Sequence, residues 1–221
     1  MASIVMVIGQ SGTGKSTSLR NFKKGEASVI NVSKKPMPFI CELPVLNCSN
    51  YSQIKELLAK ANSPSIVIDD AQYLIVSEYM AKADERGFDK FVQLAKNFWD
   101  LINFCINELP DDKIIYLLGH SEKSEDGREH FKTVGKMLDQ TCCLEGYCSV
   151  VLKTVVEDGK YYFSTHNNGY DTVKTPLGMF SEDRIENDLK AVDVRMREYF
   201  KITPKAKAEP KTEIKETKEN K

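Results

Sequence analysis

Apolar runs recur along the chain and alternate with segments whose apolar residues stand three or four positions apart. The runs are mostly continuous, as in strands that are covered on both faces of a sheet. They occupy residues 3–9, 27–32, 65–70, 113–120 and 148–156. Helices are predicted between them, in a segment opened by Lys15, in residues 51–61 and in residues 88–109. Strands that alternate with helices predict parallel β-α-β units.

The pattern changes after the last of these strands. The stretch "TVVEDGKYYFST" predicts a β-hairpin with Asp158-Gly159 as its turn. Ser181 is then the predicted N-cap of a final helix, because acidic residues follow it in the first turn. We therefore expect an α/β fold with three α/β/α layers around a mostly parallel sheet, followed by a C-terminal β-hairpin and helix.

Composition divides the chain into one domain and a tail. At 221 residues the chain can bury one sizeable core. Residues 203–221 are rich in Lys, Glu, Thr and Pro and have almost no large apolar side chains. Such a segment cannot offset the entropy cost of ordering. We expect a domain over residues 1–202 and a disordered Lys/Glu-rich tail over residues 203–221.

The charge, cysteine and hydropathy patterns exclude several classes of protein. The formal net charge of -1 excludes a globally basic nucleic-acid coat. No apolar run approaches the roughly 18 residues that a membrane helix needs. The six cysteines form no C-x-x-C pair and the three histidines have no ligand spacing, so we expect no structural metal. Reduced thiols and no basic leader favour a cytoplasmic protein without a membrane partner.

The stretch "GQSGTGKST" carries the clearest chemistry. It follows the first predicted strand, and its first eight residues fit the phosphate-binding pattern G-x-x-x-x-G-K-[ST]. Glycines in such a loop let backbone N–H groups approach phosphate closely, Lys15 reaches the β- and γ-phosphates, and the Ser16 hydroxyl ligates Mg²⁺. The predicted cofactors are ATP and Mg²⁺. The predicted cofactor-binding residues are Gly9, Gln10, Ser11, Gly12, Thr13, Gly14, Lys15, Ser16 and Thr17.

Two other predicted strands end in polar residues. The run "SIVIDD" supplies Asp69 as the second magnesium ligand and Asp70 as a group that polarises water. The run "KIIYLLGH" ends in His120, a candidate sensor of the γ-phosphate. In parallel sheets ligands lie beyond the carboxyl ends of the strands, so these residues should share one crevice with Gly9. Lys15, Asp70 and His120 are therefore catalytic candidates.

With these residues in place, the chain resembles phage-encoded P-loop ATPases of the RecA-like and AAA-like group, which act in DNA replication and recombination. The resemblance covers residues 9–200. It rests on "GQSGTGKST", "VIDDAQYL", "GFDKF", "LLGHSE", "KTVGKMLD", "LEGYCSVVL", "THNNGYDTVKTPLGMF" and "IENDL". It implies a RecA-like P-loop fold, an oligomeric ATPase and the cytoplasm of a host cell.

The sequence departs from this group in one respect. RecA-like enzymes usually carry a catalytic glutamate just after the second strand, where this chain offers Glu42. Asp70, Glu42 and Glu122 therefore compete to orient the attacking water, and Asp70 ranks first because it follows the metal-binding strand. The resemblance also implies that Lys174 contacts the nucleotide of a neighbouring subunit.

Three functions remain open. The first is a homo-oligomeric ATPase that acts on DNA, preferably single-stranded, with Lys132, Lys136 and Lys153 as a local phosphate-contacting patch. The second is a small-molecule or nucleotide kinase, although such enzymes need clustered arginines and the arginines here are scattered. The third is a module in which ATP orders an assembly surface and turnover is incidental.

Overall fold

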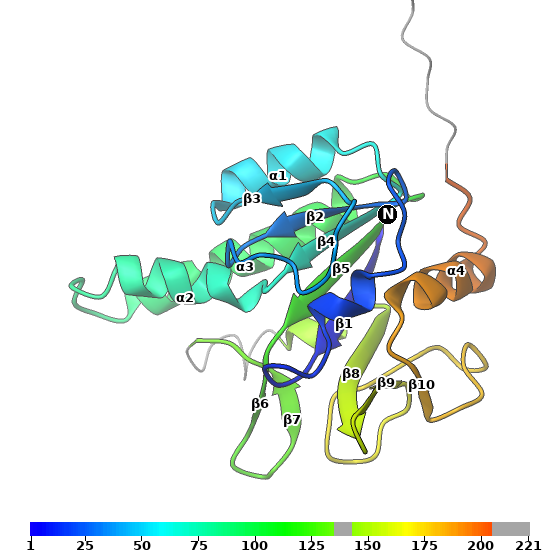
Figure 1. Ribbon diagram of the computed structural model, residues 1–221. Coiled ribbons are helices and arrows are strands. Elements are labelled where there is room, and N and C mark those ends of the chain that lie inside the picture. Colours follow the sequence, from blue (N-terminus) through cyan, green and yellow to red (C-terminus); the bar gives the residue numbers. More distant parts are fainter. Residues whose placement is uncertain (135–142, 205–221) are drawn as a thin grey trace, which may run out of the picture.

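The computed structural model describes residues 1–134 and 143–204 (Figure 1). Its central sheet has six parallel strands in the order β8-β1-β5-β4-β2-β3. They are β1 (Ser3–Ile8), β2 (Ala27–Asn31), β3 (Val45–Asn47), β4 (Ser65–Asp69), β5 (Ile114–Gly119) and β8 (Val150–Glu157). The predicted strands and the mostly parallel sheet are confirmed.

Two antiparallel strands extend the sheet beyond β8. The predicted hairpin is present: β9 (Lys160–Ser164) pairs with β8, and Asp158 and Gly159 form the turn with φ of 51° and 74°. The strand β10 (Arg184–Glu186) then pairs with β9. These strands place residues from the C-terminal part of the chain at the sheet edge beyond β8, on the β1 side of the sheet.

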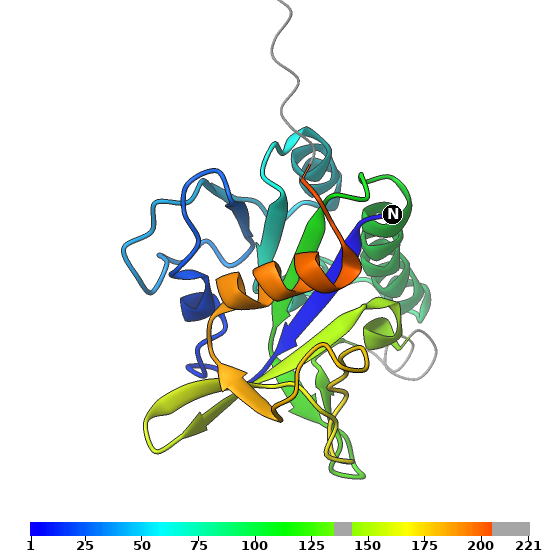
Figure 2. The same ribbon diagram turned by 90° about the vertical axis from the view of Figure 1, so that its right-hand side faces the viewer.

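Helices cover both faces of the sheet and give the expected three layers (Figure 2). On one face, α1 (Tyr51–Lys60), α2 (Gln72–Ala81) and α3 (Asp89–Asn107) pack against residues such as Met6 and Ile68. On the other, the 3-10 helix η1 (Ser16–Leu19) and α4 (Leu189–Phe200) pack against residues such as Val7 and Leu118. Because successive strand residues point to opposite faces, burial of both faces explains the uninterrupted apolar runs.

Two predicted helices differ from the structure, one in its type and length and the other in its start. The segment opened by Lys15 forms only the short η1, and Leu19 at its end and Phe22 just after it reach the core. The final helix begins at Leu189 rather than after Ser181. Asp188 is its N-cap, and its side chain accepts hydrogen bonds from the backbone N–H groups of two first-turn residues. Pairing with β9 holds residues 184–186 as a strand, so tertiary context overrides the cap signal at Ser181.

The sequence patterns missed several elements, among them α2 and a second hairpin. The strands β6 (Ser121–Lys123) and β7 (Glu129–Phe131) form a separate two-stranded sheet directly after β5, and η3 (Leu144–Tyr147) precedes β8. Residues 205–221 of the predicted tail lie outside the described residues, as does Lys136. No helix in the described part of the chain is long and apolar enough to cross a membrane.

Candidate functional site

The ends of three neighbouring strands build the candidate site. In the sheet β5 lies between β1 and β4, and all three run parallel. Their carboxyl ends therefore meet at one edge, where the loop of residues 9–17 follows β1, Asp69 ends β4 and His120 follows β5. A cavity of about 360 Å³, here called the loop cavity, lies at this edge. Lys15, Ser16, Asp69, Asp70 and His120 all line it, so the structure brings these residues together, whereas Gly9, Gln10 and Thr13 of the loop do not line it.

Glycine is required at two kinds of position in the 9–17 loop. Gly12 and Gly14 have φ of 78° and 93°, in the left-handed region that side chains disfavour. At Gly9 the reason is space, because an added Cβ would lie 1.8 Å from Oγ1 of Thr154 on β8. The hydroxyl oxygens of Thr13 and Thr154 lie 2.5 Å apart, which ties the loop to β8. The loop is therefore held in one shape with little side-chain bulk.

Lys15 is buried inside this loop. Its Nζ donates hydrogen bonds to the carbonyl oxygens of Gly9 at 2.9 Å and Gln10 at 2.8 Å. Burial lowers the pKa of Lys15, while the nearby charges of Asp70 and Asp69 oppose that change. A desolvated ammonium group whose hydrogen bonds go to carbonyl oxygens gains from an added anion. Phosphate is the anion that the loop chemistry fits.

Ser16 and Asp69 form the part of the site that suits a divalent cation. The Ser16 hydroxyl donates to Oδ1 of Asp69 at 3.0 Å. Burial raises the pKa of Asp69 to about 6, against the opposing effects of the Ser16 hydrogen bond and the Lys15 charge. Carboxylate and hydroxyl oxygens are hard ligands of the type Mg²⁺ prefers, and Mg²⁺ is usually held by one or two protein groups with water and phosphate. The donor set therefore fits magnesium.

Asp70 and His120 lie next to each other in the lining of the cavity. Nε2 of His120 lies 3.7 Å from Oδ1 of Asp70. Burial lowers the pKa of His120, and the Lys15 charge lowers it further, so the ring is neutral near pH 7. Asp70 has φ of 60°, an uncommon conformation for a residue with a side chain and one that recurs at functional sites.

The structure separates the three carboxylates that competed to orient water. Asp70 lines the loop cavity, whereas Glu42 lies exposed before β3 and does not line it. Glu122 lies on β6, where its Oε1 accepts a hydrogen bond from the backbone N–H of Thr133 at 3.1 Å. The ranking of Asp70 above the other two therefore gains support from position.

Lys174 does not join the loop cavity of its own chain. Its backbone pairs with Val151 on β8, and its Nζ donates to the carbonyl oxygen of Gly146 at 3.4 Å. A contact from Lys174 to a neighbouring subunit stays a prediction.

The proposed lysine patch needs a correction. Nζ of Lys153 lies 2.7 Å from Asp171 and 3.4 Å from Glu129, and the side chain is only 15% exposed. Two carboxylates already neutralise this lysine, so it is not available to a nucleic-acid phosphate. Lys136 lies outside the described residues, which leaves Lys132 as the described lysine of the patch.

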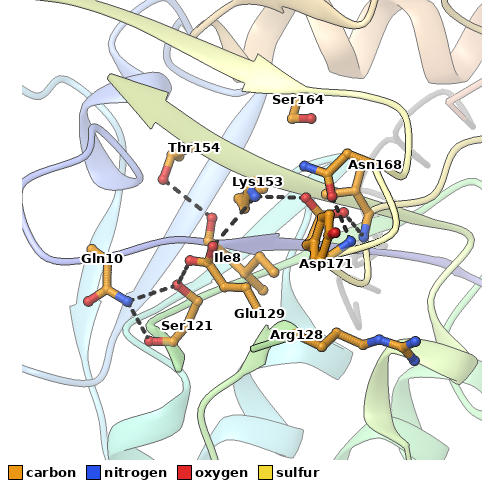
Figure 3. Close-up of polar contacts among 12 residues, drawn as sticks. Ile8, Gln10, Ser121, Arg128, Glu129, Lys153, Thr154, Ser164, Asn168 and Asp171 are labelled. Atoms are coloured by element: carbon orange, nitrogen blue, oxygen red, sulfur yellow. Dashed lines mark hydrogen bonds and ion pairs between the residues drawn. The ribbon is translucent and has the colours of Figure 1, made fainter. Parts of the chain in front are cut away.

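Lys153 instead belongs to a polar network that reaches the 9–17 loop (Figure 3). Nε2 of Gln10 donates to the carbonyl oxygen of Ser121 at 3.1 Å, and the Ser121 hydroxyl donates to Glu129 at 2.6 Å. Glu129 then forms an ion pair with Lys153, which also forms an ion pair with the fully buried carboxylate of Asp171. The network connects the loop after β1 with the β6–β7 hairpin and with β8.

Among the residues that line the loop cavity, sequence reasoning missed Asn31, Lys35 and Tyr161, together with Ser33, Pro36 and Pro38. Asn31 ends β2 at the same sheet edge, and its side-chain amide donates to the carbonyl oxygen of Lys35 at 2.6 Å. The strand-end rule that found Asp69 could have found Asn31 and Lys35. Tyr161 gives no such signal, because it lies on the hairpin strand β9.

The chemistry of the cavity is the guide to function. No protein-family model matches the chain, and no curated protein matches its sequence. Within residues 1–134 and 143–204, no group of three or more His, Cys, Asp or Glu side chains is placed to hold a metal ion. A cation at Asp69 would therefore complete its shell with water and a bound phosphate.

Proposed function

We propose that the protein binds ATP with Mg²⁺ in the loop cavity and hydrolyses it, as a P-loop ATPase of RecA-like or AAA-like type. One observation carries the proposal: the buried Lys15, the Ser16–Asp69 pair and the Asp70–His120 pair line a single cavity beside a glycine-rich loop. Each of these groups suits a different part of a triphosphate and its metal.

The residues divide the work between binding and turnover. Backbone N–H groups of the 9–17 loop and the Lys15 ammonium bind the β- and γ-phosphates, and Ser16 with Asp69 holds Mg²⁺. The metal, when bound, neutralises charge that develops on the phosphates. Asp70 accepts a hydrogen bond from the attacking water and orients it. The neutral ring of His120 hydrogen-bonds to the terminal phosphate and reports its presence to β5 and β6.

The oligomeric and DNA-related parts of the proposal rest on the resemblance. We propose that the ATPase assembles as a homo-oligomer beside single-stranded DNA during phage recombination or replication, in the cytoplasm.

None of the six arginines of the chain lines the loop cavity. This favours hydrolysis over a kinase reaction, because a kinase needs arginines that close over a second phosphate-bearing substrate.

The test combines binding and turnover. ATP titrations with Mg²⁺ should give saturable binding to the wild type, and Lys15→Ala should weaken it by at least about tenfold, the loss of one charged hydrogen-bond donor. The exposed Lys34, which does not line the cavity, supplies the control variant Lys34→Ala. A wild type that binds no ATP refutes the proposal.

Turnover separates the alternatives once binding is established. Phosphate release should occur and should change with single-stranded DNA, while light scattering follows ATP-dependent assembly. Binding without release supports the ATP-gated assembly module. Transfer of phosphate to a nucleoside or nucleotide in a panel supports the kinase. A rate indifferent to single-stranded DNA, with no DNA binding at low salt, removes the DNA part of the proposal.

A further inference from the structure

A second cavity adjoins the loop cavity on the side of η1 and the C-terminal hairpin. It has a volume of about 430 Å³, and Thr17, Arg20, Tyr161, Tyr162, Glu186 and Asn187 are among the residues that line it. Thr17 and Tyr161 line both cavities, which are therefore direct neighbours. Figure 2 shows η1 beside β10 and the hairpin from which these residues come.

The chemistry of the loop gives a bound triphosphate a direction. Asp69, Asp70 and His120 lie at the end of the loop cavity where the metal and terminal phosphate belong, and none of them lines the second cavity. Loops of this pattern cradle the α- and β-phosphates with backbone N–H groups, and their lysine reaches toward the γ-phosphate. The nucleoside must then leave the loop at its Thr17 end, where the second cavity opens.

Tyr161 stands between the two cavities. An added Cβ at Gly14 would lie 2.9 Å from Cδ1 of Tyr161 and 3.1 Å from Oδ1 of Asn187, so the bare glycine lets both side chains lie against the loop. Tyr161 is 47% exposed although its ring packs on the loop. An aromatic ring that is fixed on one side and open on the other is a platform for a flat ligand.

The surrounding polar groups hold this platform in place. The backbone N–H of Asn187 donates to the carbonyl oxygen of Tyr161 at 3.2 Å. The Arg20 guanidinium from η1 binds the carbonyl oxygen of Asn187 and the carboxylate of Glu186, the latter at 3.0 Å. Asn187 is 2% exposed, and its Nδ2 has no hydrogen-bond partner among the described residues. A buried donor without a partner is costly unless a ligand atom pairs with it.

We propose that the second cavity receives the base and ribose of the bound nucleotide, and that Tyr161 stacks on a purine base. The inference rests on the proposed function, because it needs a triphosphate in the 9–17 loop. Tyr161 then determines preference for a nucleotide over bare polyphosphate, while Lys15 and Asp69 bind the phosphate and metal that both ligands share. The Asn187 amide supplies a donor for an acceptor atom of the nucleoside.

Inorganic tripolyphosphate separates the two halves of the ligand. Mg²⁺-dependent affinities for ATP and for tripolyphosphate are measured by calorimetry on the wild type, Tyr161→Ala, Tyr161→Phe and Tyr170→Ala. Tyr161→Ala should weaken ATP binding roughly 10- to 100-fold, the range of one lost base–aromatic stack, and leave tripolyphosphate binding within about twofold. Tyr161→Phe should retain both affinities, because it keeps the ring.

The controls distinguish stacking from a structural role. Tyr170 is 71% exposed and lines neither cavity, so Tyr170→Ala should bind both ligands like the wild type. Tripolyphosphate binding also shows that each variant retains a folded loop. Equal weakening of both ligands in Tyr161→Ala, or weakening of neither, overturns the inference and leaves the proposed function standing. A wild type that binds neither ligand overturns both.

Discussion

Replacing Asp69 by asparagine should make the ligand-free protein more stable at neutral pH while removing its affinity for metal. Asp69 is 4% exposed, and burial raises its pKa from 3.8 to about 6. A shift of about two pKa units corresponds to about 3 kcal/mol between the two protonation states. The asparagine side chain would keep an acceptor for the Ser16 hydroxyl and remove the charge. Because Lys15 loses an attractive partner at the same time, we expect a net gain of about 1–3 kcal/mol.

The pH dependence follows from the direction of this shift. Well below pH 3.8 the Asp69 carboxyl is largely protonated in the folded and unfolded states, so it contributes little. Between pH 4 and 6 the folded state binds more protons than the unfolded state, and this group lowers stability as the pH rises. Above pH 6 the carboxylate is ionised in both states and the full cost applies. The advantage of Asp69→Asn should therefore be small at pH 4, about 0.5 kcal/mol, and complete at pH 7.5.

Urea denaturation with EDTA, at pH 4 and pH 7.5, measures this difference. The control is Glu42→Gln, which removes a carboxylate from an exposed loop position and should change stability by less than about 0.5 kcal/mol. Added Mg²⁺ should strengthen ATP binding to the wild type and not to Asp69→Asn. A variant that is less stable than the wild type at pH 7.5, or equally shifted at both pH values, refutes burial of the charge as the dominant effect.

Three further predictions address turnover, phosphate contact and the polar network. Asn tolerates the left-handed backbone at position 70, so Asp70→Asn should fold and bind ATP almost like the wild type. Because the variant lacks the carboxylate that orients water, its phosphate release should fall about 100-fold. Unaltered turnover would exclude the assignment of Asp70. Lys35→Ala removes a cation that lines the loop cavity and should weaken ATP binding about 3- to 10-fold in titrations, whereas Lys34→Ala should not. Lys153→Met leaves the buried Asp171 carboxylate unpaired and should cost about 3 kcal/mol in urea denaturation. Lys60→Ala, which breaks an exposed pair, should cost less than about 0.5 kcal/mol, and equal losses in the two variants would contradict the account.

The sequence was sufficient for the core strands and for the residues at their ends. Continuous apolar runs identify strands buried on both faces, and Asp69 and His120 each follow such a run. Parallel strands place their carboxyl ends at one edge, so the meeting of these residues with the 9–17 loop follows from local pattern and one topological rule. The hairpin turn at Asp158-Gly159 also follows from the local sequence, because both turn positions have positive φ and an Asp-Gly pair tolerates it.

Tertiary structure decided what depends on partners distant in the chain. The sequence indicates a free cation at Lys153, whereas the structure pairs this lysine with Asp171 and Glu129. The sequence also predicts an N-cap at Ser181, whereas the structure pairs residues 184–186 with β9 as a strand. Tyr161 reaches the loop cavity only because the hairpin lies against Gly14. The sequence by itself determined the strands and the glycine-rich loop, since each depends on neighbouring residues. Charge pairing and the second cavity depend on contacts between segments far apart in the chain, such as Arg20 with Glu186 at a separation of 166.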